Sequence, residues 1–170
     1  PQDGQEYKRK EGKQRGLKEK LSRTAFPEKH TPKINLAGAE GGTNVFKLDY
    51  FGKTVFLAQS PQLYKQALVP VYERVFEIGP VFRAEHHDTS RHLNEYIPMD
   101  FEMGFIDSFT DIMEMETGVL KYRMDLLKRE YAHETALLKA ATTVISNIPL
   151  LRFKAHKELS LNQLQNLTRH

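Results

Sequence analysis

The chain has 170 residues, of which 39% are hydrophobic and 28% are charged, and its formal net charge is +3. A chain of this length and composition is expected to form one soluble domain with a sizeable core. The absence of cysteine excludes a disulfide framework and a thiolate metal site, and neither an apolar run of membrane-spanning length nor a secretory signal is present, so we expect a cytoplasmic protein without a membrane partner.

The N-terminal region is rich in charge. Residues 1–16 contain three glycines and lack apolar periodicity, which predicts a tail or linker. Residues 17–23 predict a short helix that ends before Pro27, because the residue before a proline avoids the helical region. Residues 6–29 hold nine lysines and arginines against four glutamates. Such a run is either a solvated surface or a contact for a polyanion such as RNA.

The middle of the chain alternates short apolar runs with turn residues, which is typical of β-strands. The predicted strands cover residues 45–48, 53–58, 74–78, 81–85 and 99–106. Since short connections cannot join parallel strands, antiparallel pairing is expected. On the last strand, Asp100 and Glu102 share one face.

Helix start signals flank these strands. Ser60-Pro61 favours the start of a helix that runs to about Leu68, and Pro70 is expected to stop it. Ser108 with Asp111 predicts a capping box at the start of a long helix. The apolar stripe of that helix indicates core packing and comprises Ile112, Met115, Val119, Tyr122 and Leu126. More helix is predicted within 132–170. The fold class is therefore α+β, an antiparallel sheet flanked by helices.

Arg83 and Glu85 stand two residues apart on a predicted strand and therefore project from one face. A guanidinium can grip a phosphate and a neighbouring carboxylate can accept from an amine, so the pair suits a nucleotide. A solvated salt bridge is the alternative interpretation. A polar turn that carries Arg91 and His92 follows.

A second group of polar residues precedes this strand. Ser60, Gln62 and Lys65 cluster at a helix N-terminus, where the helix dipole and a lysine attract an anionic group. Glu40 lies between glycines in a loop that lets a ligand approach closely, and its carboxylate suits an ammonium. These groups together describe an acidic amino acid beside a nucleotide.

Several segments in this order resemble the catalytic domain of class II aspartyl-tRNA synthetases, with a second motif of the archaeal and eukaryotic form. They are TPKI at 31–34, EGG at 40–42, AQSPQLYKQ at 58–66, FRAE at 82–85 and RHLNE at 91–95. The resemblance implies a partial class II catalytic core over residues 30–170. It also implies a basic segment with a shortened motif 1 helix over residues 1–29, and Pro32 as the motif 1 proline near a dimer interface.

The resemblance implies a role for each matching residue. The aspartate-binding set is Glu40, Ser60, Gln62, Lys65 and Asp100. The ATP-binding set is Arg83, Glu85, Arg91, His92 and Tyr96. Arg83 is also the implied catalytic residue, because it would neutralise charge that grows on the α-phosphate.

The implied activity is that of an aspartate–tRNA ligase with aspartate, ATP and tRNA as substrates, Mg²⁺ as cofactor and a homodimeric assembly. The third family motif and the acidic Mg²⁺ ligands have no match in this sequence, so we expect an incomplete, weak or inactive piece with no metal site of its own. Two alternatives stay open: a non-catalytic paralogue that binds aspartate or a nucleotide, and a tRNA-independent ligase similar to asparagine synthetase.

Overall fold

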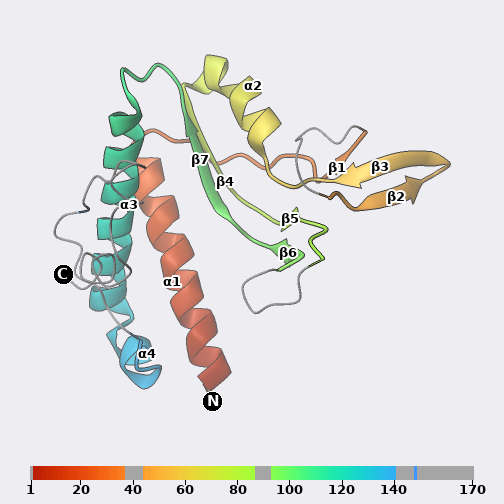
Figure 1. The fold of residues 1–170 in the computed structure, drawn as a ribbon. Coiled ribbons are helices and arrows are strands. Elements are labelled where there is room, and N and C mark those ends of the chain that lie inside the picture. The colour runs from red at the N-terminus through yellow and green to blue at the C-terminus, as the bar shows by residue number, and fades with distance from the viewer. Residues whose placement is uncertain (1, 37–43, 87–92, 141–147, 149–170) are drawn as a thin grey trace, which may run out of the picture. The chain divides into compact units, whose positions relative to one another are not determined.

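The computed structural model describes residues 2–36, 44–86, 93–140 and 148, and its helices and strands are drawn in Figure 1. The chain divides into two compact units. The strand unit is Leu21–Asp107, and the helical unit combines Pro1–Lys20 with Ser108–His170. All of the predicted site residues fall within the strand unit.

The helical unit is built on three helices in its described part: α1 (Gln2–Arg23), α3 (Phe109–Glu130) and α4 (Ala132–Leu137). The capping box predicted for the long helix is confirmed. The Ser108 side chain accepts from the Thr110 backbone N–H at 3.2 Å, and the Ser108 backbone N–H donates to the Asp111 carboxylate at 3.4 Å. Val119, Leu126 and Leu127 are the buried residues of α3.

The prediction of a linker over residues 1–16 is wrong, because α1 is a helix of 22 residues. Two of its glycines, Gly12 and Gly16, allow other side chains to pack closely against the helix. A Cβ atom at Gly12 would lie 2.7 Å from the Tyr131 ring, and one at Gly16 would lie 3.1 Å from the Arg123 side chain. Tertiary packing of this kind stabilises a helix that intrinsic propensity alone does not favour.

The strand unit contains seven strands among the described residues. They are β1 (Ile34–Asn35), β2 (Lys47–Tyr50), β3 (Lys53–Leu57), β4 (Arg74–Ile78), β5 (Val81–Phe82), β6 (Glu95–Tyr96) and β7 (Met99–Met103). They form three small sheets in the orders β1-β3-β2, β4-β7 and β5-β6, and every pair of strands is antiparallel. The predicted α+β class with antiparallel pairing is therefore confirmed.

The helix α2 (Gln62–Tyr72) begins where the sequence predicts, but Pro70 lies inside it. The predicted stop at Pro70 is therefore wrong. A proline removes one backbone donor and so weakens a helix, yet α2 continues to Tyr72, and the N–H of the C-cap residue Glu73 still donates to the Val69 carbonyl at 2.7 Å. Pro70 thus sits in the last turn, where only one intrahelical bond is lost.

The core of the strand unit lies around the β4–β7 pair. Phe26, Val75 and Phe76 are almost fully buried, and the Phe26 ring meets Phe101 of β7 edge to face at 5.8 Å. The extended segment after α1 also pairs with β4, since Phe76 exchanges backbone hydrogen bonds with Pro27 at 3.2 Å and with Lys29 at 2.8 Å. This packing holds residues 27–33 beside the strand that leads to Arg83.

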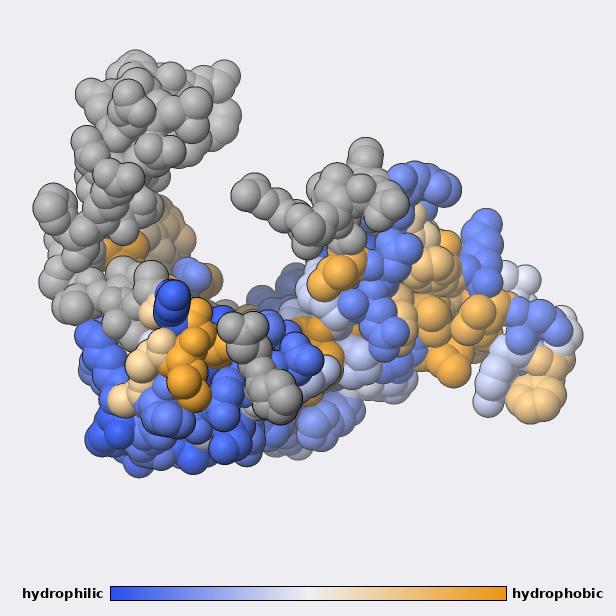
Figure 2. All heavy atoms as spheres, turned by 90° about the horizontal axis from the view of Figure 1, so that it is seen from below, coloured by the Kyte–Doolittle hydropathy of each residue, from blue (hydrophilic) through white to orange (hydrophobic). Residues whose placement is uncertain are grey.

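The three-stranded sheet is less enclosed. Hydrophobic side chains gather over it in the view of Figure 2, and the large exposed ones are Ile34, Leu48, Tyr50 and Phe51. Tyr50 and Phe51 stack edge to face at the tip of the β2–β3 hairpin, with ring centroids 4.7 Å apart. Across the described residues, no helix combines the length and apolar character that crossing a membrane would need.

Candidate amino-acid and nucleotide site

Backbone hydrogen bonds bring separate parts of the strand unit to one place. The Ala58 N–H donates to the Lys33 carbonyl at 2.9 Å, and the Ala58 carbonyl accepts from Phe82 at 2.9 Å. The Arg83 N–H then donates to the Asn94 carbonyl, also at 2.9 Å. Because these hydrogen bonds join backbones, they fix where the chain runs next to each of them, and so they fix the positions of the neighbouring side chains.

Lys65 lies at the centre of the site. The residue is 3% exposed, although a lysine is almost never fully buried unless it is paired. Its ammonium donates to Asp100 Oδ1 at 2.5 Å and to the Phe101 carbonyl at 3.4 Å, and it lies 3.2 Å from Glu102 Oε2. Asp100 and Glu102 share one face of β7, as the alternation of that strand predicts.

Residues at the start of α2 extend this cluster. The Gln62 side-chain amide donates to Glu102 Oε2 at 3.2 Å, so Gln62 and Lys65 share a carboxylate. The Ser60 hydroxyl accepts from the Gln62 backbone N–H at 3.0 Å. The spacing of Ser60, Gln62 and Lys65 therefore places all three around one end of α2, as the sequence predicts.

The nucleotide half of the predicted site is also partly assembled. The Arg83 guanidinium lies 5.7 Å from the centre of the Tyr96 ring, which comes from the strand paired with β5. Arg83 and Glu85 are both half-buried. β5 is shorter than the predicted strand over 81–85, and Arg83 directly follows it. The structure brings Arg83 beside Tyr96 of β6, with Glu85 two residues further along.

Three predicted residues, Glu40, Arg91 and His92, lie outside the described residues. The structure thus places Ser60, Gln62, Lys65 and Asp100 together, and it places Arg83 beside Tyr96. Within the described residues there is no group of three or more His, Asp or Glu side chains arranged to hold a metal ion.

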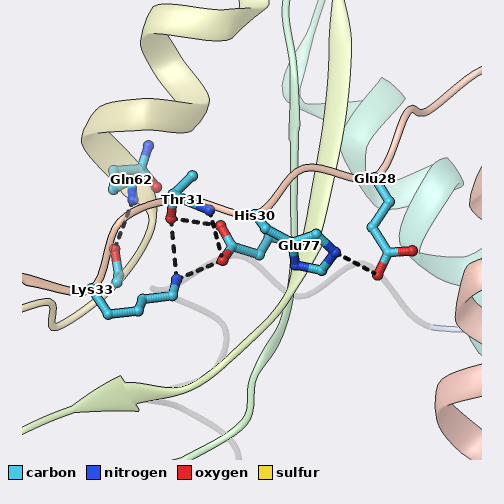
Figure 3. Close-up of polar contacts among 7 residues, drawn as sticks. Glu28, His30, Thr31, Lys33, Gln62 and Glu77 are labelled. Carbon is cyan, nitrogen blue, oxygen red and sulfur yellow. Dashed lines mark hydrogen bonds and ion pairs between the residues drawn. The ribbon is translucent and has the colours of Figure 1, made fainter.

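Sequence reasoning missed two contributions. Glu102 was placed on the face of Asp100 but was given no role, although it contacts both Lys65 and Gln62. The half-buried Lys33 and the buried Glu77 form an ion pair at 2.5 Å that connects two distant segments (Figure 3). The alternation of charges on β7 could have indicated Glu102, whereas the Lys33–Glu77 pair depends on contacts across 44 residues that no local pattern encodes.

The family model of tRNA synthetases class II (D, K and N) matches residues 9–165. The chain is 50% identical over 135 residues to the aspartate–tRNA(Asp/Asn) ligase of Deinococcus radiodurans, covering 79% of this chain and 31% of the relative. It is 45% identical over 151 residues to the ligase of the same name from Thermus thermophilus, covering 88% of this chain and 36% of the relative. The chain thus spans about a third of the length of these relatives.

Solved structures give the same family. Asparaginyl-tRNA synthetase from Pyrococcus horikoshii, complexed with asparaginyl-adenylate, superposes with a TM-score of 0.77 at 31% identity, over 83% of this chain and 32% of that one. A putative aspartyl-tRNA synthetase from Leishmania major gives a TM-score of 0.71 at 34% identity, over 79% of this chain and 26% of that one. The resemblance predicted from the sequence is confirmed, and the chain belongs to the class II tRNA synthetases of the D, K and N type.

Proposed function

We propose that this chain is the part of an aspartate–tRNA ligase that binds aspartate and ATP. The observation that carries the proposal is the buried Lys65 ammonium, held by Asp100 and Glu102 at the N-terminal end of α2. The relatives named aspartate–tRNA(Asp/Asn) ligase support the choice of aspartate as the amino acid.

The amino-acid half would work by charge complementarity. Lys65 would bind the side-chain carboxylate of aspartate, and Asp100 and Glu102 would fix the position of its ammonium. Gln62 would orient the amino acid, while Ser60 and Glu40 would hold its α-ammonium. An amino acid with an uncharged or cationic side chain would bring no anion to the Lys65 ammonium. This difference would give selectivity for an acidic ligand.

The nucleotide half would align ATP with that amino acid. Arg83 would bind the α-phosphate as the aspartate α-carboxylate attacks phosphorus and pyrophosphate leaves, and it would neutralise the charge that grows there. Glu85 would accept from the adenine amine and Tyr96 would flank the adenine. Arg91 and His92 would contact the outer phosphates. The aspartyl group would then pass from the adenylate to the 3′ end of tRNA.

The remaining parts of the proposal extend beyond these residues. Mg²⁺ is expected with ATP in this family, and the side chains that the structure describes offer it no cluster of three or more ligands. We also propose residues 30–170 as a partial catalytic domain, with Pro32 near a homodimer interface. A cytoplasmic location, tRNA as the final acceptor, and weak or absent activity of this piece alone complete the proposal.

An exchange assay tests the proposal. Labelled pyrophosphate is incubated with ATP and the protein, with aspartate, asparagine or lysine added in turn, and the label that enters ATP is measured. Label that enters ATP only with aspartate supports the ligase. Exchange that needs aspartate and ammonia and gains nothing from tRNA would instead indicate the asparagine synthetase-like alternative. Because weak or absent activity is proposed for the 170-residue chain alone, the assay is repeated on a longer polypeptide that contains it. Binding of aspartate or ATP by that longer polypeptide without any exchange would indicate the non-catalytic alternative.

A further inference from the structure

A buried carboxylate lies on β4 next to the proposed aspartate pocket. Glu77 is 2% exposed, and three donors from one short segment satisfy it (Figure 3). The Lys33 ammonium lies 2.5 Å from Oε1, the Thr31 hydroxyl donates to Oε2 at 2.7 Å, and the Thr31 backbone N–H donates to Oε1 at 3.2 Å. Such complete pairing is what allows a charge to remain buried.

The backbone at Gly79 packs closely against this pair. A Cβ atom at Gly79 would lie 2.8 Å from Glu77 Oε1 and 3.5 Å from the Lys33 Cε atom. A side chain at this position would therefore displace the carboxylate or the lysine. The position of the pair is set by the backbone that leads from β4 into β5.

The register of β4 and β7 places this pair beside the pocket. Glu77 is directly opposite Asp100, and Val75 is directly opposite Glu102. Residues that face each other across an antiparallel pair point to the same side of the sheet. Glu77, Asp100 and Glu102 therefore share one face, where two ion pairs, Lys33–Glu77 and Lys65–Asp100, are neighbours.

The charges on this face determine what Lys65 can do. Three carboxylates share the face with the two ammonium groups of Lys33 and Lys65, which leaves one negative charge in excess. If the Lys33 charge were removed, the Glu77 charge would stand uncompensated beside Asp100. The field of Glu77 would then draw the Lys65 ammonium and repel an incoming carboxylate.

We propose that Lys33 and Glu77 are positioning residues for the aspartate pocket. Because their charges pair with each other, the Lys65 ammonium stays bound to Asp100 and Glu102 and can bind the ligand carboxylate. This inference rests on the proposed function. Neither residue is assigned a contact with aspartate or ATP, so both act through Lys65 and through the Thr31–Lys33 segment.

The test uses three variants of the 170-residue chain: Lys33→Met, Glu77→Gln and the double variant. Isothermal titration gives the Kd for a non-hydrolysable aspartyl-adenylate analogue and, separately, for ATP. Lys33→Met is expected to weaken analogue binding about tenfold while ATP binding changes less than about twofold, because the register places the unpaired Glu77 charge opposite Asp100, in the amino-acid half of the site. Lys47→Met, an exposed lysine on β2, is the matched control and should change neither Kd.

The double variant separates a positioning role from a structural one. It removes both charges, and a buried ion pair replaced by neutral groups is usually tolerated. Analogue binding is therefore expected to recover most of the loss seen in Lys33→Met. Equal losses for analogue and ATP in every variant, or no recovery in the double variant, would overturn the inference.

A ligand-free readout keeps the inference separate from the proposed function. The ¹⁵Nζ resonance of Lys65 should shift in Lys33→Met and return toward its original position in the double variant. If the unaltered chain binds no analogue, the proposed function fails, while the resonance still tests the positioning role. A Lys65 resonance that stays unchanged in Lys33→Met would overturn the role by itself.

Discussion

The ammonium of Lys65 lies 2.5 Å from Asp100 Oδ1, and the Lys65 side chain is only 4% exposed, whereas that of Asp100 is 30% exposed. The lysine is thus enclosed while its carboxylate partner still meets solvent. An anion that arrives from solvent would find the ammonium already oriented by the protein. This arrangement supports a pocket for an acidic side chain.

Lys65→Met should destabilise the fold as well as remove ligand binding. The substitution leaves Asp100 and Glu102 close together without their shared cation, and breaking a buried ion pair costs roughly 3–5 kcal/mol. Urea unfolding measures the loss. Gln66→Met, an exposed neighbour on the same helix, is the control and should stay within about 0.5 kcal/mol of the unaltered chain. Similar stabilities for both variants would contradict a paired, buried Lys65.

Arg83→Ala should weaken the aspartyl-adenylate analogue by about tenfold or more, because a charge-assisted contact with the phosphate is lost. Arg83→Lys should recover only part of that affinity, since a lysine lacks the planar fork of a guanidinium. Calorimetric titration gives the Kd of the analogue for both variants. Full recovery with lysine would show that Arg83 supplies charge without the bidentate geometry.

Gly12→Ala and Gly4→Ala form a matched pair within α1. Alanine favours helix over glycine by up to about 1 kcal/mol, and a Cβ at Gly4 meets nothing within 4 Å, so Gly4→Ala should stabilise slightly. A Cβ at Gly12 would lie 2.7 Å from the Tyr131 ring, so Gly12→Ala should destabilise by about 1–3 kcal/mol. Thermal unfolding of both variants shows whether each substitution raises or lowers the stability of the chain. If Gly12→Ala also stabilised the chain, α1 would not pack against Tyr131.

The free energy of unfolding at acid pH should depend in part on Glu130. A hydrogen bond from Arg129, and a further one from Arg15, lower the pKa of the Glu130 carboxyl from 4.5. A carboxyl whose pKa is lower in the folded state adds stability above its unfolded pKa and loses it as the pH falls through the folded value. The stability difference between the unaltered chain and Glu130→Gln should therefore be constant above about pH 6 and shrink below 4.5. Because Glu130 is exposed, the effect should be small and should weaken in high salt. A difference that did not change between pH 6 and pH 3 would contradict these contacts.

Sequence patterns predicted those parts of the fold that depend on interactions between residues close together in the sequence. Ser108 and Asp111 form the capping box that their spacing indicates, and Ser60, Gln62 and Lys65 meet at one end of α2. The capping box and the Ser60–Gln62 hydrogen bond join residues within one helical turn, so the local pattern is enough to predict them. The contacts of Gln62 and Lys65 with Glu102 need β7 in addition.

Other parts depend on contacts that are distant in sequence. The part of α1 before residue 17 was missed because its glycines weaken intrinsic propensity, whereas Gly12 allows close packing against Tyr131 and Gly16 against Arg123. The helical course of α2 through Pro70 was missed because only one bond is lost near the end of the helix. The Lys33–Glu77 pair was missed because it follows from the pairing of residues 27–33 with β4. Each of these features belongs to tertiary packing.

The most direct measurement is calorimetric titration of the 170-residue chain with non-hydrolysable aspartyl-, asparaginyl- and lysyl-adenylate analogues under identical conditions. The three ligands share the nucleotide, so differences in Kd report the amino-acid pocket around Lys65. The account predicts that the aspartyl analogue binds at least about tenfold more tightly than the other two, because only its side chain brings an anion to that ammonium. Equal affinities, or tighter binding of the asparaginyl or lysyl analogue, would contradict the assignment of this pocket to aspartate.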